Sequence, residues 1–419
     1  MRFTLIALGS RGDVQPFIAL AVGLQKTGRH KVRFAAPDNF EFLAREHSLD
    51  FFPLGVDTQK MLGPGGIDPD QNLLLWFSEV LRSMKPIAER IADNTWLVCQ
   101  DTDFIIYSMV GIWAYHVAEK LNIPCIMASP IPGVVPTRAY PNPNGIFPSL
   151  PLGGGYNRLT HILSQQLFQL FTGSLINRWR KEKLHLPAIP FGKYPYCQMG
   201  GRPQHFLGSY SPIVSPKPPD WGDHIHVCGY WFLDPAPQWQ PPAQLISFLE
   251  AGSPPVYIGF GSMANRAPQK MAQLAQQALK KSGQRGILAT GWGGLDNADL
   301  PDNIFSLDSA PHTWLFPHMA AVVHHGGAGT TGASFRAGIP SILVPHMGDQ
   351  SFWAKRVTEL GVGPQPIPRR KLTVERLVAA ITTATIDKNM QARAASLGDR
   401  IRAEDGVTRA IELIEGFTQ

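Results

Sequence analysis

The sequence lacks the features that would assign it to a secreted, membrane-spanning or metal-binding class. Only four cysteines occur in 419 residues, and none is spaced from another Cys or His as in a metal site. Free thiols are typical of a reducing compartment, and there is no secretory leader and no Asn-x-Ser/Thr sequon. No segment approaches the ~20 apolar residues that a membrane-spanning helix needs. We therefore expect a cytoplasmic protein with no transmembrane segment and no metal.

Charge is also scarce. Charged residues make up 17% of the chain and the net charge is +6. The densest basic run is Arg369-Arg370-Lys371, and no basic helix with interleaved aromatic residues occurs, so we expect no nucleic-acid partner. The apolar fraction of 44% excludes a disordered chain. The low charge suggests apolar surface reserved for a ligand or a bilayer, which leaves peripheral membrane contact open.

The length and the pattern predict an α/β protein with two domains. Short β-rich runs alternate with helical patterns in both halves of the chain, beginning with a strand at Phe3–Leu8 and restarting with a strand at Pro255–Phe260. Such alternation is typical of doubly wound, mostly parallel sheets, which bind ligands at the carboxyl ends of their strands. We expect two Rossmann-like domains that face each other across a cleft, with the site in that cleft.

A proline-rich stretch separates the two halves. Eight prolines lie between Ser211 and Pro242, around a short strand-like piece at His226–Gly229. This composition is typical of a semi-rigid connector. The predicted domains are thus residues 1–210, a linker over 211–242, and residues 243–419, where the helical pattern from Val374 to the end leaves open whether terminal helices pack back on the first domain.

The strongest chemical signal is the segment His324-His-Gly-Gly-Ala-Gly-Thr-Thr331. It follows an apolar strand and opens a helix, so the backbone N–H groups at the helix start can bind an anion such as a diphosphate. A tight turn with glycines needed for packing is the alternative. Of the two histidines, His324 is favoured as the functional one because it ends the strand and faces the turn. The expected donor-binding residues here are His324, Gly326, Gly327, Ala328, Gly329, Thr330 and Thr331.

A second signal, Gly9-Ser-Arg-Gly-Asp-Val-Gln-Pro16, lies between the first strand and the first helix. Pro16 suits a first helical turn, so Asp13 just before it is expected to be the helix N-cap. A carboxylate at a strand's carboxyl end can also accept the proton of an attacking hydroxyl, provided that desolvation raises its pKa. Both roles are compatible. Ser10, Arg11 and Gly12 would contact phosphate.

Other strand ends in the second half add weaker signals. Ser262 could bind phosphate, Trp292 could stack on a base, and the Ser309-Ala-Pro-His312 turn could present backbone groups to a base edge. Asp349 and Gln350 suit bidentate hydrogen bonds to sugar hydroxyls, with a helix N-cap as the alternative for Asp349. Together these sites favour a nucleotide diphosphate with a hydroxyl-rich tail. No Asp-x-Asp motif is present, so helix dipole and backbone donors would have to neutralise the diphosphate.

These motifs, with Pro311-His-Thr-Trp-Leu-Phe-Pro317, resemble those of family 1 glycosyltransferases of the GT-B fold. The sterol 3-beta-glucosyltransferases and the vancomycin-type antibiotic glycosyltransferases are the most similar groups, and the resemblance covers nearly the whole chain. It implies an inverting, metal-independent sugar transfer from a UDP- or TDP-sugar, with Asp13 as the base. It also implies that Ser262 assists the diphosphate site and that Asp349 and Gln350 hold the sugar. Trp292 and the 309–312 turn would lie near the nucleobase of the donor.

The resulting hypothesis is transfer of glucose from UDP-glucose to a hydroxyl of a lipophilic acceptor such as a sterol or a polyphenol. Apolar residues around Met61–Phe77 and Ile131–Leu170 would shape the acceptor pocket, although core packing is the alternative for most of them. Two other hypotheses remain: a sugar-nucleotide epimerase of the same fold, and a non-catalytic subunit that binds a nucleotide sugar.

Overall fold

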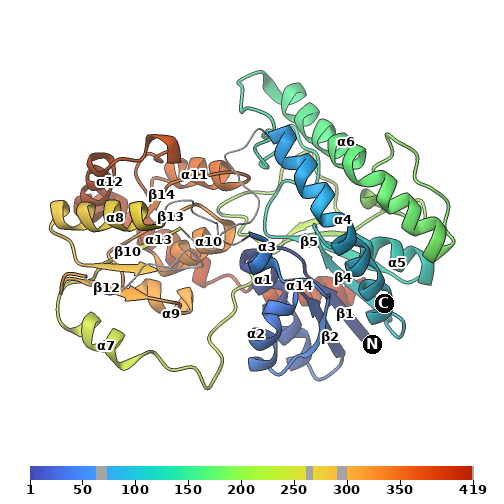
Figure 1. Cartoon of the computed structure of the whole chain (residues 1–419), viewed down its shortest axis with the longest axis horizontal. Coiled ribbons are helices and arrows are strands. Elements are labelled where there is room, and N and C mark those ends of the chain that lie inside the picture. The colour runs from blue at the N-terminus through green and yellow to red at the C-terminus, as the bar shows by residue number, and fades with distance from the viewer. Residues whose placement is uncertain (63–72, 261–267, 290–299, 418–419) are drawn as a thin grey trace. The chain divides into compact units, whose positions relative to one another are not determined.

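The computed structural model describes residues 1–62, 73–260, 268–289 and 300–417 and divides into two compact units. The first contains Met1–Met61, Ile67–Trp231 and Asp405–Gln419, and the main part of the second is Phe232–Glu404. The boundary after Trp231 falls inside the predicted 211–242 linker. Each unit is built on its own parallel sheet (Figure 1).

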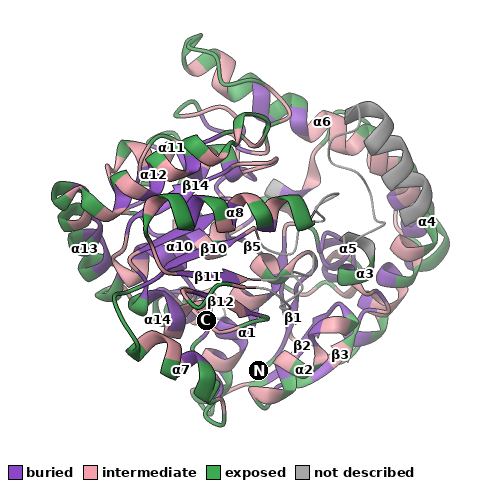
Figure 2. Ribbon diagram, turned by 60° about the vertical axis from the view of Figure 1, so that its left-hand side comes forward, coloured by how far each residue is buried: buried purple, intermediate pink, exposed green. Residues whose placement is uncertain are grey.

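The sheet of the first unit has seven parallel strands in the order β3-β2-β1-β4-β5-β8-β9. Central strands of a parallel sheet are covered on both faces, and the near-continuous apolar runs of β1 and β4 satisfy that requirement (Figure 2). A short antiparallel pair, β6–β7, lies apart from it. The strands are β1 Arg2–Ile6, β2 Lys31–Ala36, β3 Asp50–Pro53, β4 Phe104–Ser108, β5 Cys125–Ser129, β6 Gln198–Met199, β7 Arg202–Pro203, β8 Phe206–Gly208 and β9 Ile225–Val227.

Helices that cover this sheet come from both ends of the chain. The last helix packs on the first, where a side chain at Gly23 would lie 2.5 Å from the Val407 side chain, and His30 is hydrogen-bonded to Glu415 at 2.9 Å. The chain therefore returns to the first unit at its end. The helices are α1 Arg11–Lys26, α2 Glu41–Glu46, α3 Thr58–Leu62, α4 Leu73–Val98, α5 Trp113–Leu121, α6 Gly153–Trp179, which continues as a wider turn over Arg180–Leu184, and α14 Gly406–Gly416.

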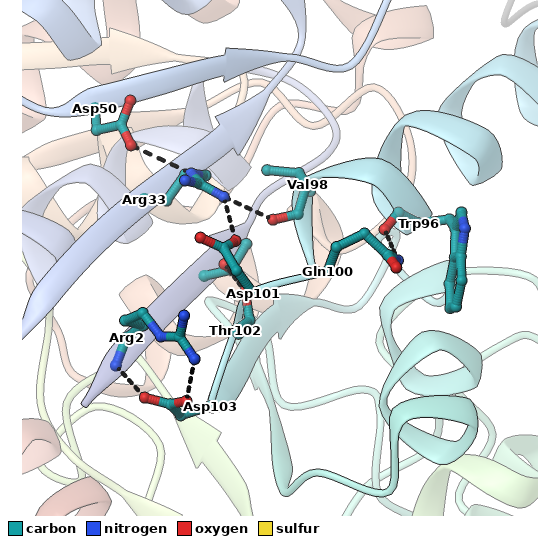
Figure 3. A network of polar contacts seen from close by, with 10 residues as sticks. Arg2, Arg33, Asp50, Trp96, Val98, Gln100, Asp101, Thr102 and Asp103 are labelled. Atoms are coloured by element: carbon teal, nitrogen blue, oxygen red, sulfur yellow. Dashed lines mark hydrogen bonds and ion pairs between the residues drawn. The ribbon is translucent and has the colours of Figure 1, made fainter.

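Ion pairs join the amino-terminal edge of this sheet (Figure 3). The backbone N–H and the guanidinium of Arg2, at the start of β1, donate to Asp103 just before β4, at 2.8 and 2.9 Å. Arg33 on β2 donates to Asp101 at 2.8 Å and to Asp50 at 3.2 Å. These hydrogen bonds hold the pKa values of Asp101 and Asp103 below the usual range. The charged groups of this edge are thus paired with one another, and the opposite edge carries the loops described below.

The second unit has a five-stranded parallel sheet in the order β12-β11-β10-β13-β14. Alternate residues of β10 feed two apolar layers: Val256 and Ile258 pack toward α8 and α12, and Tyr257 packs with residues of α7 and α9. The strands are β10 Val256–Gly259, β11 Gly286–Ala289, β12 Ile304–Leu307, β13 Ala321–His324 and β14 Ser341–Leu343. The helices are α7 Ala243–Glu250, α8 Pro268–Ser282, α9 His312–Leu315, α10 Ala328–Ala337, α11 Gln350–Glu359, α12 Val374–Ile386 and α13 Lys388–Arg402.

The prediction of two doubly wound parallel sheets is confirmed. One expectation about the connector needs correction, because the strand-like piece inside it is the edge strand β9 of the first sheet, paired in parallel with β8. Backbone pairing with the preceding strand outweighs the proline-rich surroundings there. Within the part of the chain that the structure describes, no helix is long and apolar enough to cross a membrane. Cys99, Cys125 and Cys228 are free and buried, and the cytoplasmic location stays a prediction.

Candidate active site

The loop between β1 and α1 holds a partly buried carboxylate in a fixed position. Asp13 Oδ2 accepts hydrogen bonds from the backbone N–H of Ser10 at 2.8 Å and from its hydroxyl at 2.9 Å. A side chain at Gly9, whose φ is 125°, would lie 2.4 Å from this oxygen, so glycine is required there. Ser108, at the end of β4, steadies the loop by accepting the Leu8 N–H at 3.0 Å.

The sequence predicted Asp13 as the helix N-cap, and this prediction is wrong. The helix begins at Arg11 with Ser10 as its N-cap, so Asp13 is the third residue of the first turn and Pro16 lies inside the helix. The Ser10 hydroxyl, which we expected to contact phosphate, is committed to Asp13. Arg11 is exposed and its Nε donates to Gln15 at 3.2 Å, and Gly12 is half-buried.

The protonation behaviour of Asp13 suits a base. Burial raises the pKa of the Asp13 carboxyl above its usual range, and the two hydrogen bonds from Ser10 offset part of that rise. A carboxylate with a raised pKa is a stronger proton acceptor than an exposed one, yet remains ionised at neutral pH when the shift is moderate.

The loop between β13 and α10 has the same strand-to-helix form but carries no acid. Gly327 is the N-cap, and the first turn of α10 contains no carboxylate and no capping side chain. The first backbone N–H with a helical partner is that of Thr331, which donates to the Gly327 oxygen at 2.9 Å. The N–H groups of Ala328, Gly329 and Thr330 therefore remain as the positive end of the helix.

The two histidines of this loop have different surroundings. His324 is fully buried beneath the loop, and its Nδ1 accepts the Gly326 N–H at 3.1 Å. The half-buried His325 lies over the helix start, since a side chain at Gly327 would come within 2.5 Å of its Nε2. The Nε2 of His324 has no hydrogen-bond partner among the described residues, and the assignment of His324 as the donor-binding histidine stays a prediction. Burial lowers the pKa of His325 to about 4, so the ring is neutral at neutral pH.

The loop between β14 and α11 is held by its own side chains. The Gln350 carbonyl oxygen accepts the N–H groups of His346 and Met347 at 2.7 and 3.1 Å. Asp349 is the helix N-cap, and its Oδ2 accepts the Trp353 indole N–H at 2.7 Å. A side chain at Gly326 would lie 3.2 Å from the backbone oxygen of Gln350, which is a different atom from the side-chain amide oxygen above, so this loop and the β13 loop are in contact.

All strands of this sheet run parallel, so the loops after β12, β13 and β14 lie at one edge. The strand order reverses at β10, and β10 pairs with β13 through Gly259 and His324. Ligands of open α/β sheets bind at this kind of switch point. Among the described residues, no group of three or more His, Cys, Asp or Glu side chains could hold a metal ion.

Known proteins resemble the chain over its whole length. Residues 3–141 match the glycosyltransferase family 28 N-terminal domain, and residues 291–413 match the C-terminal domain of erythromycin biosynthesis protein CIII-like proteins. Sterol 3-beta-glucosyltransferases of Cryptococcus neoformans and Arabidopsis thaliana are 38% and 37% identical to it over 99% and 98% of the chain. The chain spans 27% of the length of the fungal relative and 65% of that of the plant relative.

Solved structures agree on the architecture. The calicheamicin glycosyltransferase CalG4 superimposes with a TM-score of 0.71 at 17% identity, over 99% of this chain and 98% of that one. The Streptomyces glycosyltransferase SsfS6, in complex with thymidine diphosphate, gives a TM-score of 0.66 at 19% identity, over 99% of both chains. The chain has the GT-B fold of these proteins, and it is similar to glycosyltransferases over its whole length.

The predicted donor residues of the second half of the chain are placed as follows. His324, Gly326–Thr331, Asp349 and Gln350 lie at one edge of the second sheet, as does the turn after β12, where Ser309 is exposed and Ala310 and His312 are half-buried. The Thr331 side chain is buried and its hydroxyl donates to the Gly327 oxygen at 2.9 Å, so it does not face the loop. Ser262 and Trp292 lie outside the described residues. The donor-binding roles themselves stay predictions.

One residue at this edge was missed from the sequence. His346 follows β14 by three residues and stacks on Phe260, with ring centroids 5.9 Å apart. Burial, together with the nearby Arg369 guanidinium and His325 ring, lowers its pKa to about 3. The available signal was its position: it stands after a strand and shortly before the Gly348-Asp-Gln350 segment.

The sequence also predicted acceptor loops around residues 61–77 and 131–170, and residues 63–72 of the first lie outside the described residues. The segment Pro130–Leu152 has no helix or strand and is tied to α6, where the Asn142 N–H donates to the Thr160 hydroxyl at 2.8 Å and His161 is hydrogen-bonded to the Tyr140 oxygen at 3.1 Å. Four of the predicted apolar residues, Leu159, Ile162, Leu163 and Leu170, are exposed on α6.

Proposed function

We propose that the chain transfers glucose from UDP-glucose to a hydroxyl of a lipophilic acceptor, with inversion at the anomeric carbon and without a metal. The observation that carries this proposal is the Asp13 carboxylate, fixed by Ser10 at the carboxyl end of a central strand and with a raised pKa. Sterol is the favoured acceptor class, since curated relatives that carry the name sterol 3-beta-glucosyltransferase match 98% to 99% of the chain.

The transfer step would proceed in one displacement. Asp13 accepts the proton of the acceptor hydroxyl while the hydroxyl oxygen forms a bond to the anomeric carbon. The bond from that carbon to the diphosphate breaks, and its electron pair leaves with UDP. The backbone N–H groups of Ala328–Thr330 and the positive end of α10 stabilise the charge that develops on the diphosphate.

The second half of the donor site supports the same assignment. His325 and His346 are neutral at neutral pH, so they act as hydrogen-bonding groups rather than as cations. Asp349 and Gln350 form hydrogen bonds within the loop that we assign to sugar binding, and these bonds fix the shape of that loop. Recognition of uracil by the turn after β12 is part of the proposal.

The test compares a 3β-hydroxysterol with its 3-keto analogue, which lacks the attacking hydroxyl. With UDP-glucose, we expect UDP release and a glucoside only with the hydroxysterol, and a polyphenol tests the broader acceptor class. UDP-sugar conversion in the absence of any acceptor would instead support an epimerase. Binding of UDP-glucose with no turnover on any acceptor would support a non-catalytic subunit.

A further inference from the structure

The long helix α6 has an inverted distribution of polar and apolar residues. The face that it turns inward in its first half carries Thr160, His161 and Ser164, all buried and hydrogen-bonded. Its outward face carries four large apolar side chains at helical spacing, namely Leu159, Ile162, Leu163 and Leu170. A surface helix in water normally has the opposite arrangement.

A neighbouring loop extends this apolar face. Gln169 on α6 donates to the backbone oxygens of Pro190 and Lys193 at 2.8 and 3.1 Å and accepts the Gly192 N–H at 2.9 Å. Phe191 lies in sequence between these hydrogen-bonded residues, so it is held beside the helix. The four α6 side chains and Phe191 are between 39% and 68% exposed, and we call these five residues the α6 face.

Exposed apolar side chains are concentrated in this region. Of the twelve large apolar residues that are exposed in the described chain, seven lie between Leu150 and Phe191. Single exposed apolar residues need no explanation, but a cluster of this kind marks a surface that contacts a protein, a membrane or an apolar ligand.

The charge of the same region is strongly one-sided. Between Lys120 and Asp220 there are nine Lys and Arg residues and one acid, the exposed Glu182. Three of the nine, Arg178, Arg180 and Lys183, are paired with acids of other segments. Arg158, Lys181 and Lys193 are exposed and form none of the ion pairs found among the described residues, although Arg158 lies near enough to Asp220 to help lower the pKa of that carboxyl. The apolar face is therefore accompanied by positive charge.

We propose that the α6 face is a docking surface for an anionic phospholipid bilayer. The five apolar side chains would enter the boundary between headgroups and acyl chains, and Arg158, Lys181 and Lys193 would bind the acidic headgroups. Basic residues beside an apolar helix face complement a negatively charged membrane, whereas a second copy of this chain would bring like charges together. The proposal does not depend on the transfer reaction.

The test is co-sedimentation of the full chain with sterol-free vesicles, without UDP-glucose. Vesicles of phosphatidylcholine alone are compared with vesicles that also contain phosphatidylserine. We expect about tenfold stronger partitioning onto the anionic vesicles, weakened by salt. Leu163→Gln/Leu170→Gln and Lys181→Gln/Lys193→Gln should each lower partitioning about tenfold, because each removes one of the two attractions.

Matched controls lie in the same unit. Phe42 on α2 is 75% exposed, so Phe42→Gln removes an equally accessible apolar side chain away from the α6 face. Lys26→Gln/Lys31→Gln removes two exposed charges elsewhere. Both controls should bind the vesicles like the unmodified chain, and circular dichroism should show the same fold in all variants.

Two outcomes would overturn the proposal. One is partitioning that is equal on neutral and anionic vesicles and unaffected by the α6 variants. The other is a dimer in sedimentation velocity that Leu163→Gln/Leu170→Gln converts to a monomer while no form binds vesicles, which would show that a second copy covers the face.

Discussion

The turns that open α1 and α10 are built alike and have opposite electrostatics. Each follows a buried strand, and each has a glycine as its second helical residue, Gly12 in α1 and Gly329 in α10. The third residue is Asp13 in α1, where its carboxylate satisfies the Ser10 N–H, and Thr330 in α10, where no acid is present. One helix start is therefore occupied by the protein's own anion, and the other is open to the anion of a ligand.

This difference explains how one type of turn can serve two halves of a reaction. A carboxylate that already holds the helix start is fixed in position and can accept a proton. An open helix start can stabilise a leaving diphosphate without a metal. The four predictions below test this difference from the largest expected effect to the smallest.

Removing the charge of Asp13 should have the largest effect. Asp13→Asn keeps an oxygen that can accept from Ser10 but cannot act as a base, so we expect turnover to fall by about a hundredfold or more. UDP affinity, measured by calorimetry, should barely change. Turnover close to that of the unmodified chain would mean that Asp13 only stabilises the start of α1.

Giving α10 the acid that α1 has should block the donor site. Thr330→Asp places a carboxylate at the position that corresponds to Asp13, and we expect it to weaken UDP binding about tenfold or more, because its negative charge at the helix start repels the diphosphate. Thr330→Asn, of equal size and without charge, is the control.

The stability of the Thr330→Asp variant adds a second readout. The free energy of unfolding should stay the same or rise by about 0.3–1 kcal/mol, because an acid in the first turn stabilises a helix. Equal UDP affinity in the Asp and Asn variants would show that the diphosphate does not bind at α10.

Removing the hydrogen bond from the Ser10 hydroxyl to Asp13 should shift the pH dependence of kcat/KM. The Ser10 hydroxyl lowers the pKa of Asp13, so in Ser10→Ala that pKa rises and the base is protonated over a wider pH range. The acidic limb of the kcat/KM profile should move to higher pH, with little loss of kcat/KM at pH values well above the pKa of Asp13 in both forms. Ser10→Thr keeps the hydroxyl and should retain the original profile.

The smallest effect is expected from metal removal. If the open end of α10 neutralises the diphosphate, then EDTA should leave the rate of glucoside formation unchanged. Loss of activity with chelator and recovery with magnesium or manganese would assign the charge stabilisation to a metal ion instead.

The sequence by itself determined the two doubly wound sheets and the segments at their strand ends. A short apolar run such as Phe104–Ser108 is typical of a buried strand. Glycines directly after a strand mark a tight turn into a helix. The motifs around Asp13 and His324 were found in this way, since their residue types and spacing are local properties.

Tertiary structure decided which side chain of each motif faces outward. The choice between His324 and His325 depends on the burial of β13 between two strands, which no local pattern reveals. The role of Asp13 depends on where α1 begins, which the Ser10 hydrogen bonds fix. The packing of α14 on α1 and the pairing of β9 with β8 depend on contacts between distant segments. These outcomes follow from which surfaces meet when the chain is folded, and that information is not contained in any short stretch of sequence.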